Sequence, residues 1–240
     1  MNQINFSSIY KQFANQELDW LPMDTHDKFI EHLEHRFADL KKYGWIDKKI
    51  SYKFNSLGFR CEEFTEEPSI MFLGCSNTIG IGLPIEETWA SIVAKNLNLK
   101  CVNLGQGGGS PDLCFRLCYG FLELIKPKVV VYNEPPPGRL ELAVQLNETA
   151  RRLKSIQLKD VNVNSEPYLK DYVSDITNTK MNYEKNYYAI KSLCADKNIK
   201  FVYSNDYWLE RADKGDYARD LSHPGTNHNF FFARHILSQI

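Results

Sequence analysis

Ser69-Ile-Met-Phe-Leu-Gly-Cys-Ser-Asn77 is the stretch of this 240-residue chain on which the predicted fold depends. Its first five residues form an apolar run of the length of a buried strand, and a glycine and a serine follow directly. From residue 68 onward, such runs alternate with segments of helical periodicity. Further strands are predicted at 99–103, 128–132 and 200–203, and helices at 86–97, 110–125, 183–196 and 227–240. This alternation predicts an α/β fold with a doubly wound parallel sheet.

Composition limits the classes of partner and compartment. The hydrophobic fraction of 43% is sufficient for a large core, and the formal charge of −1 gives no reason to expect nucleic acid or an anionic membrane as a partner. The N-terminus lacks the pattern of a signal peptide, and no apolar run approaches the ~20 residues of a membrane span. We therefore expect a soluble protein of the cytoplasm.

The chain is divided into two parts by its periodicity. Residues 1–50 are expected to form a helical appendage, and residues 51–240 the α/β domain. The appendage contains a predicted helix over 24–43, which Asp24 or Thr25 caps and Gly44 ends. We expect it to pack against the domain, a partner or a second copy of the chain.

Several potential metal ligands have a simpler interpretation. His32 and His35 are predicted to lie on the charged, solvent-facing side of the N-terminal helix. Cys114 and Cys118 are one helical turn apart, but no second ligand pair accompanies them, so core packing is favoured over a metal site. The six scattered cysteines predict reduced, mostly buried thiols.

Two distant segments supply the parts of a serine hydrolase. Ser76 follows the first strand, and Asp220-Leu-Ser-His223 places a carboxylate three residues before a histidine. Because the carboxyl ends of parallel strands meet at one edge of the sheet, these residues are expected to converge there. Ser76 is then the nucleophile, His223 the general base and Asp220 its orienting acid, with Asp216 as the alternative acid.

The predicted site also contains candidates for stabilising an oxyanion. Backbone amides near Gly108, in the run Gly105 to Gly109, and the side-chain amide of Asn133 follow the second and third strands. Residues 142–175 are less regular and predict an insertion at the same edge. Arg139 and Glu141, near the expected pocket wall, are predicted to form a structural ion pair.

These blocks, in this order, resemble the SGNH (GDSL-type) hydrolase family over residues 51–240, about four-fifths of the chain. The four matching segments are Gly74-Cys-Ser76, Asn103 to Ser110, Asn133 and Asp220-Leu-Ser-His223, and the lead-in Asn55 to Arg60 is also similar to one branch of the family. The resemblance implies a flavodoxin-like fold, a Ser76–His223–Asp220 triad, and an oxyanion hole formed by Ser76, Gly108 and Asn133.

The chain departs from the family pattern at two places. Cys75 stands where the family has the aspartate of Gly-Asp-Ser, and Tyr132-Asn-Glu-Pro-Pro-Pro-Gly138 replaces the Gly-x-Asn-Asp block. The second change places the asparagine earlier relative to the strand, and the triple proline favours a stiff, extended loop.

An ester hydrolase is the predicted function, with an acyl-enzyme on Ser76 and an O-acylated carbohydrate or another small ester as substrate. This chemistry needs neither a metal nor an organic cofactor. The alternative is a non-catalytic binding or structural module that keeps the scaffold and docks through its N-terminal helix. A nucleotide-binding loop at Gly105 to Ser110 is disfavoured, because the run lacks the third fingerprint glycine and follows the second strand.

Overall fold

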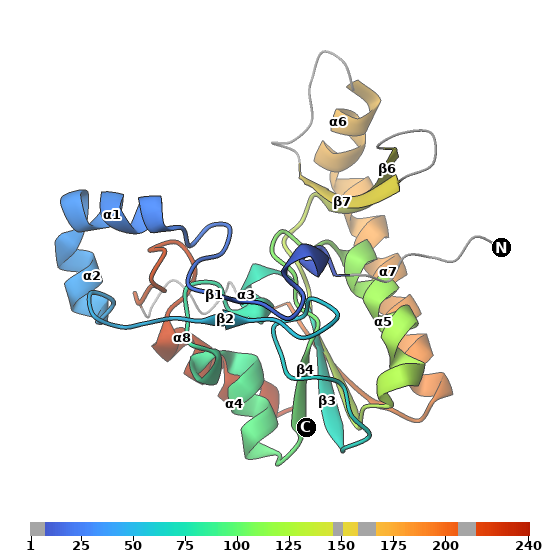
Figure 1. The fold of residues 1–240 in the computed structure, drawn as a ribbon. Helices are drawn as coiled ribbons and strands as arrows, with labels where there is room; N and C mark the ends of the chain where they lie inside the picture. Colours follow the sequence, from blue (N-terminus) through green and yellow to red (C-terminus); the bar gives the residue numbers. More distant parts are fainter. Residues whose placement is uncertain (1–7, 146–150, 158–166, 206–214) are drawn as a thin grey trace.

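A four-stranded parallel sheet forms the centre of the computed structural model, which describes residues 8–145, 151–157, 167–205 and 215–240. The strand order is β4-β3-β5-β8. Figure 1 shows β4 and β3 side by side. The strands span Ser69–Leu73 (β3), Lys100–Asn103 (β4), Val129–Asn133 (β5) and Lys200–Ser204 (β8). β3 pairs in parallel with both β4 and β5, and β5 with β8. The predicted doubly wound, flavodoxin-like arrangement is confirmed.

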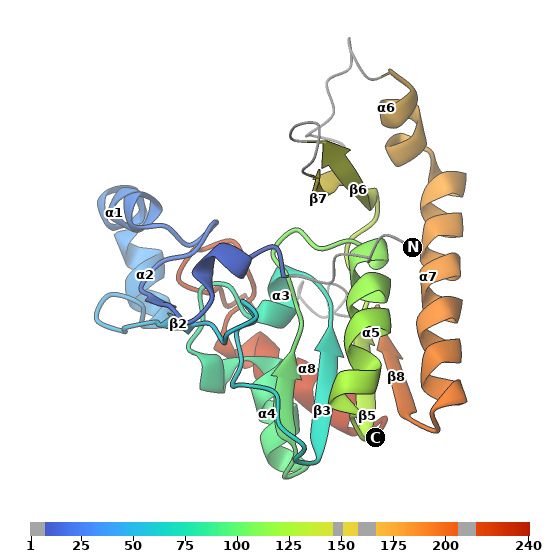
Figure 2. The ribbon, with the colours of Figure 1, turned by 45° about the vertical axis from the view of Figure 1, so that its right-hand side comes forward.

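Helices cover both faces of this sheet, as Figure 2 shows. Ile70 and Phe72 of β3 pack against α4 (Trp89–Asn96) and α8 (Thr226–Leu237). Met71 and Leu73, which point to the opposite face, lie in the cluster that contains α5 (Pro111–Ile125) and α7 (Ile176–Asp196). Because every β3 residue is buried, the strand is apolar throughout rather than alternating.

Caps account for where the two longest helices begin. Ser110 accepts a hydrogen bond from Leu113 N–H, with Pro111 in the first turn, so α5 begins as predicted. α7 begins at Ile176, seven residues before the predicted start at 183, because the Asp175 carboxylate accepts hydrogen bonds from two N–H groups of the first turn.

The N-terminal region contains two helices where one was predicted. α1 (His26–His35) and α2 (Phe37–Tyr43) are separated at Arg36, whose φ of −135° is not helical. Thr25 caps α1, and Gly44 ends α2 in the left-handed conformation, as expected. The region also contains the short helix η1 (Lys11–Phe13) and the antiparallel strands β1 (Glu17–Leu18) and β2 (Tyr52–Lys53).

The N-terminal region shares a hydrophobic core with two loops of the α/β part. Leu40, Trp45 and Phe54 are buried together with Leu83 and Leu221. Leu83 lies on the segment that follows Ser76, and Leu221 lies on the segment that contains His223. Burial of these side chains therefore ties residues 8–54 to the edge of the sheet where the candidate site lies.

The insertion predicted as irregular contains regular structure. β6 (Arg139–Gln145) and β7 (Arg151–Gln157) form an antiparallel hairpin, and α6 (Pro167–Ser174) precedes α7. Figures 1 and 2 place the hairpin and α6 beyond the carboxyl ends of the sheet strands. The prediction of irregularity was wrong for these segments, and residues 146–150 and 158–166 of the insertion lie outside the described part.

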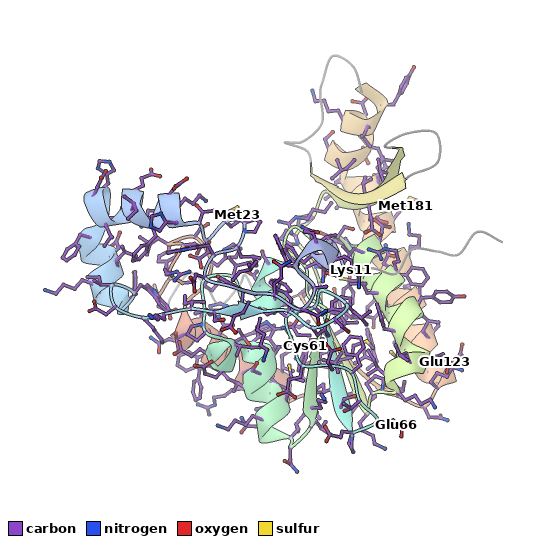
Figure 3. All side chains as sticks on the ribbon, viewed as in Figure 1. Lys11, Met23, Cys61, Glu66, Glu123 and Met181 are labelled. Carbon is purple, nitrogen blue, oxygen red and sulfur yellow. The ribbon has the colours of Figure 1, made fainter. Side chains whose placement is uncertain are left out.

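Side chains separate clearly into interior and surface sets. In Figure 3, Cys61 lies among packed side chains beside the sheet, whereas Glu66, Glu123 and Met181 lie at the surface. Five of the six cysteines are buried and Cys101 is partly buried, all as free thiols, as predicted. Within the described segments, no helix is both long enough and apolar enough to cross a membrane.

An aromatic cluster on one face of the sheet provides a test of this packing. Phe72 contacts Trp89 edge to face at 5.1 Å between ring centroids, and Trp89 contacts Phe232 in the same way at 5.0 Å. Phe72→Ala should lower the free energy of unfolding by about 3–5 kcal/mol, measured by urea denaturation, because all three rings are fully buried. Phe230→Ala, at a ring that is 48% exposed, is the matched control and should cost less than about 1 kcal/mol. Equal costs would contradict this packing.

Candidate active site

Asp220 and His223 form a hydrogen-bonded acid–base pair. Asp220 Oδ2 lies 2.5 Å from His223 Nδ1, and Asp220 Oδ1 accepts hydrogen bonds from the N–H groups of Ser222 and His223. Burial raises the pKa of the Asp220 carboxyl, but the hydrogen bonds and the charge of His223 outweigh it and leave that pKa below its ordinary value. The carboxylate therefore stays ionised and fixes the imidazole ring through Nδ1.

Asp216, the alternative acid, has a different role. Its two carboxylate oxygens accept hydrogen bonds from the N–H groups of Asn227 and His228, in the first turn of α8. A carboxylate at this position satisfies free N–H groups and the positive end of the helix dipole. Gly225 leaves space for it, since a Cβ there would lie 2.5 Å from Asp216 Oδ2. Asp220 is thus the carboxylate that contacts His223.

Ser76 begins the short helix α3 (Ser76–Ile79), directly after β3. The residue is partly exposed, in contrast to the buried residues on either side of it. Among the described residues, neither its hydroxyl nor its backbone N–H makes a hydrogen bond, so the hydroxyl is not bonded to His223. Such contacts are often loose in the absence of a substrate.

The loops that carry Ser76 and His223 are bonded to each other. Arg219 N–H donates to Gly82 O at 3.0 Å, in the segment that follows α3. Gly82 has a φ of +74°, and a Cβ on it would lie 2.8 Å from Ala218 Cβ. Only glycine fits this close approach without strain. The topology therefore brings the serine loop and the acid–base loop together at one edge of the sheet.

The glycine run lies against the turn that precedes Ser76. Gln106 N–H donates to Gly74 O at 3.2 Å, and a Cβ on Gly109 would lie 3.5 Å from Cys75 Cα. Gly108 has a φ of +69°, and its N–H makes no hydrogen bond to any described residue. This N–H therefore remains an available donor beside the serine loop.

Asn133 is the last residue of β5 and lies beneath the same turn. Its carbonyl oxygen would be 2.9 Å from a Cβ on Gly74, and its side-chain Nδ2 lies 3.5 Å from Thr78 Oγ1. The side chain is buried, and its Oδ1 has no hydrogen-bond partner among the described residues. Ser76 and Asn133 thus lie at the carboxyl ends of the two strands between which the strand order reverses, where ligands bind in open α/β sheets.

Residues that sequence reasoning missed hold the glycine run in place from the N-terminal region. Tyr10 Oη accepts a hydrogen bond from Gly107 N–H at 3.1 Å, and Gln106 Oε1 accepts from Ser8 Oγ and Ile9 N–H. Burial raises the pKa of Tyr10 to about 12, although the Gly107 hydrogen bond acts in the opposite direction. The phenol is neutral at physiological pH.

Arg60 holds the segment after Ser76 from the opposite side. Its buried guanidinium donates to the carbonyl oxygens of Ile79, Gly80 and Leu83 at 3.1, 2.6 and 2.7 Å. Burial lowers its pKa to about 10, so it stays cationic at neutral pH. The sequence signal for this role was the lead-in Asn55 to Arg60, which carried a family resemblance but no stated function.

A buried ion pair joins the N-terminal region to the acid–base loop. Arg219 donates to both carboxylate oxygens of Asp24, at 3.0 and 2.8 Å, and lies over the Trp20 ring at 4.0 Å. Tyr52 Oη lies 2.5 Å from Asp24 Oδ2 and accepts from Gly82 N–H. The network therefore connects the residue that precedes Asp220 with the loop that follows Ser76.

His32 was predicted to face solvent, and the structure corrects this. Its Nδ1 is buried and has no hydrogen-bond partner among the residues that the structure describes, and the side chain lies near Asp220, whereas His35 is exposed. Burial and the neighbouring charge of Arg36 lower the pKa of His32, and Glu31 and Asp220 raise it by less. The charged residues next to His32 in the sequence suggested an exposed helix face, whereas α1 packs beside the acid–base loop.

The predicted Arg139–Glu141 ion pair is also corrected. Glu141 accepts two hydrogen bonds from Arg116, at 2.7 and 2.8 Å, and both of those side chains are largely buried. Arg139 instead donates to Gly109 O at 3.4 Å. Glu141 reaches Arg116 because β6 packs against α5, and a contact between such distant segments was not visible in the sequence. No group of three or more His, Cys, Asp or Glu side chains suited to a metal occurs in the described segments.

Comparison with known proteins finds similar solved structures but no matching family model or curated protein. Among solved structures, the chain is similar to a G-D-S-L family lipolytic protein from Desulfitobacterium hafniense, with 12% identity, a TM-score of 0.38, and coverage of 72% of this chain and 99% of that one. It is also similar to the esterase EstA from Pseudoalteromonas sp., with 15% identity, a TM-score of 0.40, and coverage of 71% and 94%.

A third similar structure is a carbohydrate esterase whose active site has divergent catalytic and non-catalytic binding functions. The identity is 15%, the TM-score 0.41, and the coverage 72% of this chain and 64% of that one. The G-D-S-L family, whose motifs the sequence resembles, is thus represented among these structures. Because the identities and TM-scores are low, we infer the function from the residues of the site and not from these similarities.

The buried ion pair can be tested by a double-mutant cycle. Arg219→Met and Asp24→Asn should each lower the free energy of unfolding by about 3–5 kcal/mol, because each leaves a buried partner unsatisfied. The double variant should lose less than the sum, as measured by urea denaturation. The exposed pair Lys180 and Glu184 is the control and should show a coupling of about 0.5 kcal/mol or less. Additive losses at Asp24 and Arg219 would exclude their coupling.

The lowered pKa of Asp220 predicts a pH-dependent contribution to stability. The ionised carboxylate stabilises the folded chain fully above the ordinary carboxyl pKa of about 3.9, and this stabilisation is lost as the pH falls through the lower folded-state value. The difference in unfolding free energy between the wild type and Asp220→Asn should therefore be larger at about pH 6 than at about pH 3. A difference that grows as the pH falls would reverse the sign of the inferred shift.

Proposed function

We propose that this chain is a serine-dependent hydrolase that cleaves esters. One observation carries the proposal. Asp220 and His223 are 2.5 Å apart, and the loop that contains them is hydrogen-bonded to the loop that follows Ser76. A buried carboxylate that fixes Nδ1 of an imidazole leaves Nε2 to act as a base. Ser76, a partly exposed residue, is the proposed nucleophile at this edge of the sheet.

In the proposed first half-reaction, His223 Nε2 removes the Ser76 hydroxyl proton while Oγ attacks the ester carbonyl carbon. The tetrahedral intermediate collapses when the C–O bond to the alcohol breaks, and the imidazolium returns the proton to the leaving alcohol. In the second half-reaction, His223 removes a proton from water, which attacks the acyl-enzyme. The carboxylic acid leaves, and the proton returns to Ser76. Asp220 stays ionised and stabilises the imidazolium in both steps.

The negative charge of the tetrahedral intermediate requires preorganised donors. The N–H groups of Ser76 and Gly108 are proposed for this role, and neither is engaged by another described residue. Asn133 is the proposed third donor, through its Nδ2, whose hydrogen bond within the described part of the chain is the 3.5 Å contact with Thr78. Such donors act strongly because they are already oriented before the reaction.

The proposed substrate is an O-acylated carbohydrate or another small ester. The free N–H groups of Ser76 and Gly108, which no other described residue engages, suit a polar ester group. The alternative is a binding module that keeps the scaffold without turnover. Its motivation is the Ser76 hydroxyl, which has no hydrogen bond to His223. Reactivity of Ser76 separates the two possibilities.

Modification by a fluorophosphonate tests the activated serine. Such a probe should add once to the chain, at Ser76, as intact-protein mass spectrometry and peptide mapping would show. Ser76→Ala should abolish the adduct, and His223→Ala should slow its formation by about 10³-fold or more, because the base is lost.

Ser222→Ala is the matched control, since this serine lies beside His223, is exposed and is not proposed as a nucleophile. It should leave the rate of modification unchanged. A folded protein that forms no adduct, when a known serine esterase does, would reject the hydrolase proposal and favour the binding module.

A further inference from the structure

Arg139 places a guanidinium beside the candidate site, and no carboxylate of the described segments pairs with it. Its Nη1 donates to Gly109 O, and no described carboxylate lies within ion-pair distance of it. Glu141, the nearest acid in sequence, is occupied on both oxygens by Arg116. A guanidinium has five N–H donors, so most of the hydrogen-bonding capacity of Arg139 is unused within the described residues.

The backbone of Arg139 is held firmly. Its carbonyl oxygen accepts a hydrogen bond from Asn182 Nδ2, and Glu141 N–H donates to Asp112 Oδ2. Asp112 lies in the first turn of α5, and Asn182 lies on α7 and also donates to Asp112. The start of β6 is therefore hydrogen-bonded to both helices that cover this face of the sheet. These bonds fix the position of the Arg139 backbone, from which the side chain extends.

The Arg139 guanidinium lies close to the turn that precedes Ser76. A Cβ on Gly109, which Arg139 contacts, would lie 3.1 Å from Gly74 O and 3.5 Å from Cys75 Cα. The Tyr183 phenol lies near Arg139 and near Cys75. Burial and the charge of Glu134 raise the pKa of Tyr183, Arg139 lowers it, and Cys75 raises it further. Arg139 and Tyr183 also line a shallow hollow next to the start of β6.

We propose that Arg139 binds a carboxylate of the substrate, so that the preferred esters are anionic. The inference rests on the proposed hydrolase function and deepens it. A planar guanidinium matches a carboxylate with two parallel hydrogen bonds, and partial burial strengthens them. The substrate class is an ester with a free carboxylate, either on the acyl group, as in a half-ester of a dicarboxylic acid, or on the alcohol, as in an O-acylated sugar acid.

Paired fluorophosphonates test this preference on the full chain. In the first pair, one probe has a carboxylate at the end of its alkyl group and the other has the methyl ester. This alkyl group corresponds to the acyl group of a substrate. The second pair carries the same two groups on the alkoxy chain, which stands for the alcohol side. The readout is the second-order rate constant for modification of Ser76. In one pair, the anionic probe should react about 10- to 100-fold faster than the neutral one.

Arg139→Met should reduce that ratio to about one, because the rate of the anionic probe falls far more than the rate of the neutral probe. Arg139→Lys should retain part of the ratio. Lys185→Met is the matched control, because it removes a cation bound to Asp112 on the same network, and it should keep the full ratio. A ratio near one for the wild type in both pairs would overturn the proposal. An equal loss of rate for both probes in Arg139→Met would also overturn it, since that result indicates a structural role.

The neutral probes keep the two proposals separate. If they modify Ser76 and the ratio is near one, the hydrolase proposal stands and the role of Arg139 is rejected. If none of the probes modifies Ser76 in a folded protein, both proposals fail together.

Discussion

The buried ion pair between Asp24 and Arg219 is the interaction on which the geometry of the candidate site depends. Arg219 precedes Asp220, and its own N–H bonds to Gly82 in the loop that follows Ser76. Removing two charges from water is costly, and the cost is offset only where the geometry is good and the remaining hydrogen bonds are satisfied. Here Tyr52 and the backbone of Asp19 complete the hydrogen bonds. The same network that satisfies these charges also sets the separation of the serine and acid–base loops.

The parallel sheet and the N-terminal region have complementary roles in this arrangement. The sheet delivers Ser76, the glycine run and Asn133 to one edge, because β3, β4 and β5 all end there. It does not by itself fix the loops that follow. Arg60 and Tyr10 do so from segments that precede the first sheet strand, through carbonyl and amide groups of those loops. Residues 8–60 are thus part of the framework of the site, whereas the sequence suggested only a helical appendage up to residue 50.

The sheet and the identity of the Asp–His pair could be predicted from the sequence, because both depend on local patterns. A buried strand is recognisable from Ser69–Leu73 alone, and three-residue spacing lets Asp220 reach His223 within one turn. Contacts between distant segments could not be predicted. Arg116 pairs with Glu141 because β6 packs against α5, and His32 is partly buried because α1 lies beside the acid–base loop. Charged residues are exposed to solvent on average, but tertiary packing wholly or partly buries the side chains at these positions.

The bond between Asp24 and Arg219 spans 195 residues of sequence, and this separation bears on how the chain is made. During synthesis the N-terminal segment leaves the ribosome long before its partners near residue 220 exist. Leu40, Trp45 and Phe54 share their core with both Leu83 and Leu221, so this core stays incomplete until Leu221 has emerged. Apolar surface exposed for that time is prone to aggregation and to capture by chaperones. The N-terminal region that holds the loops of the candidate site therefore completes its native contacts only near the end of synthesis.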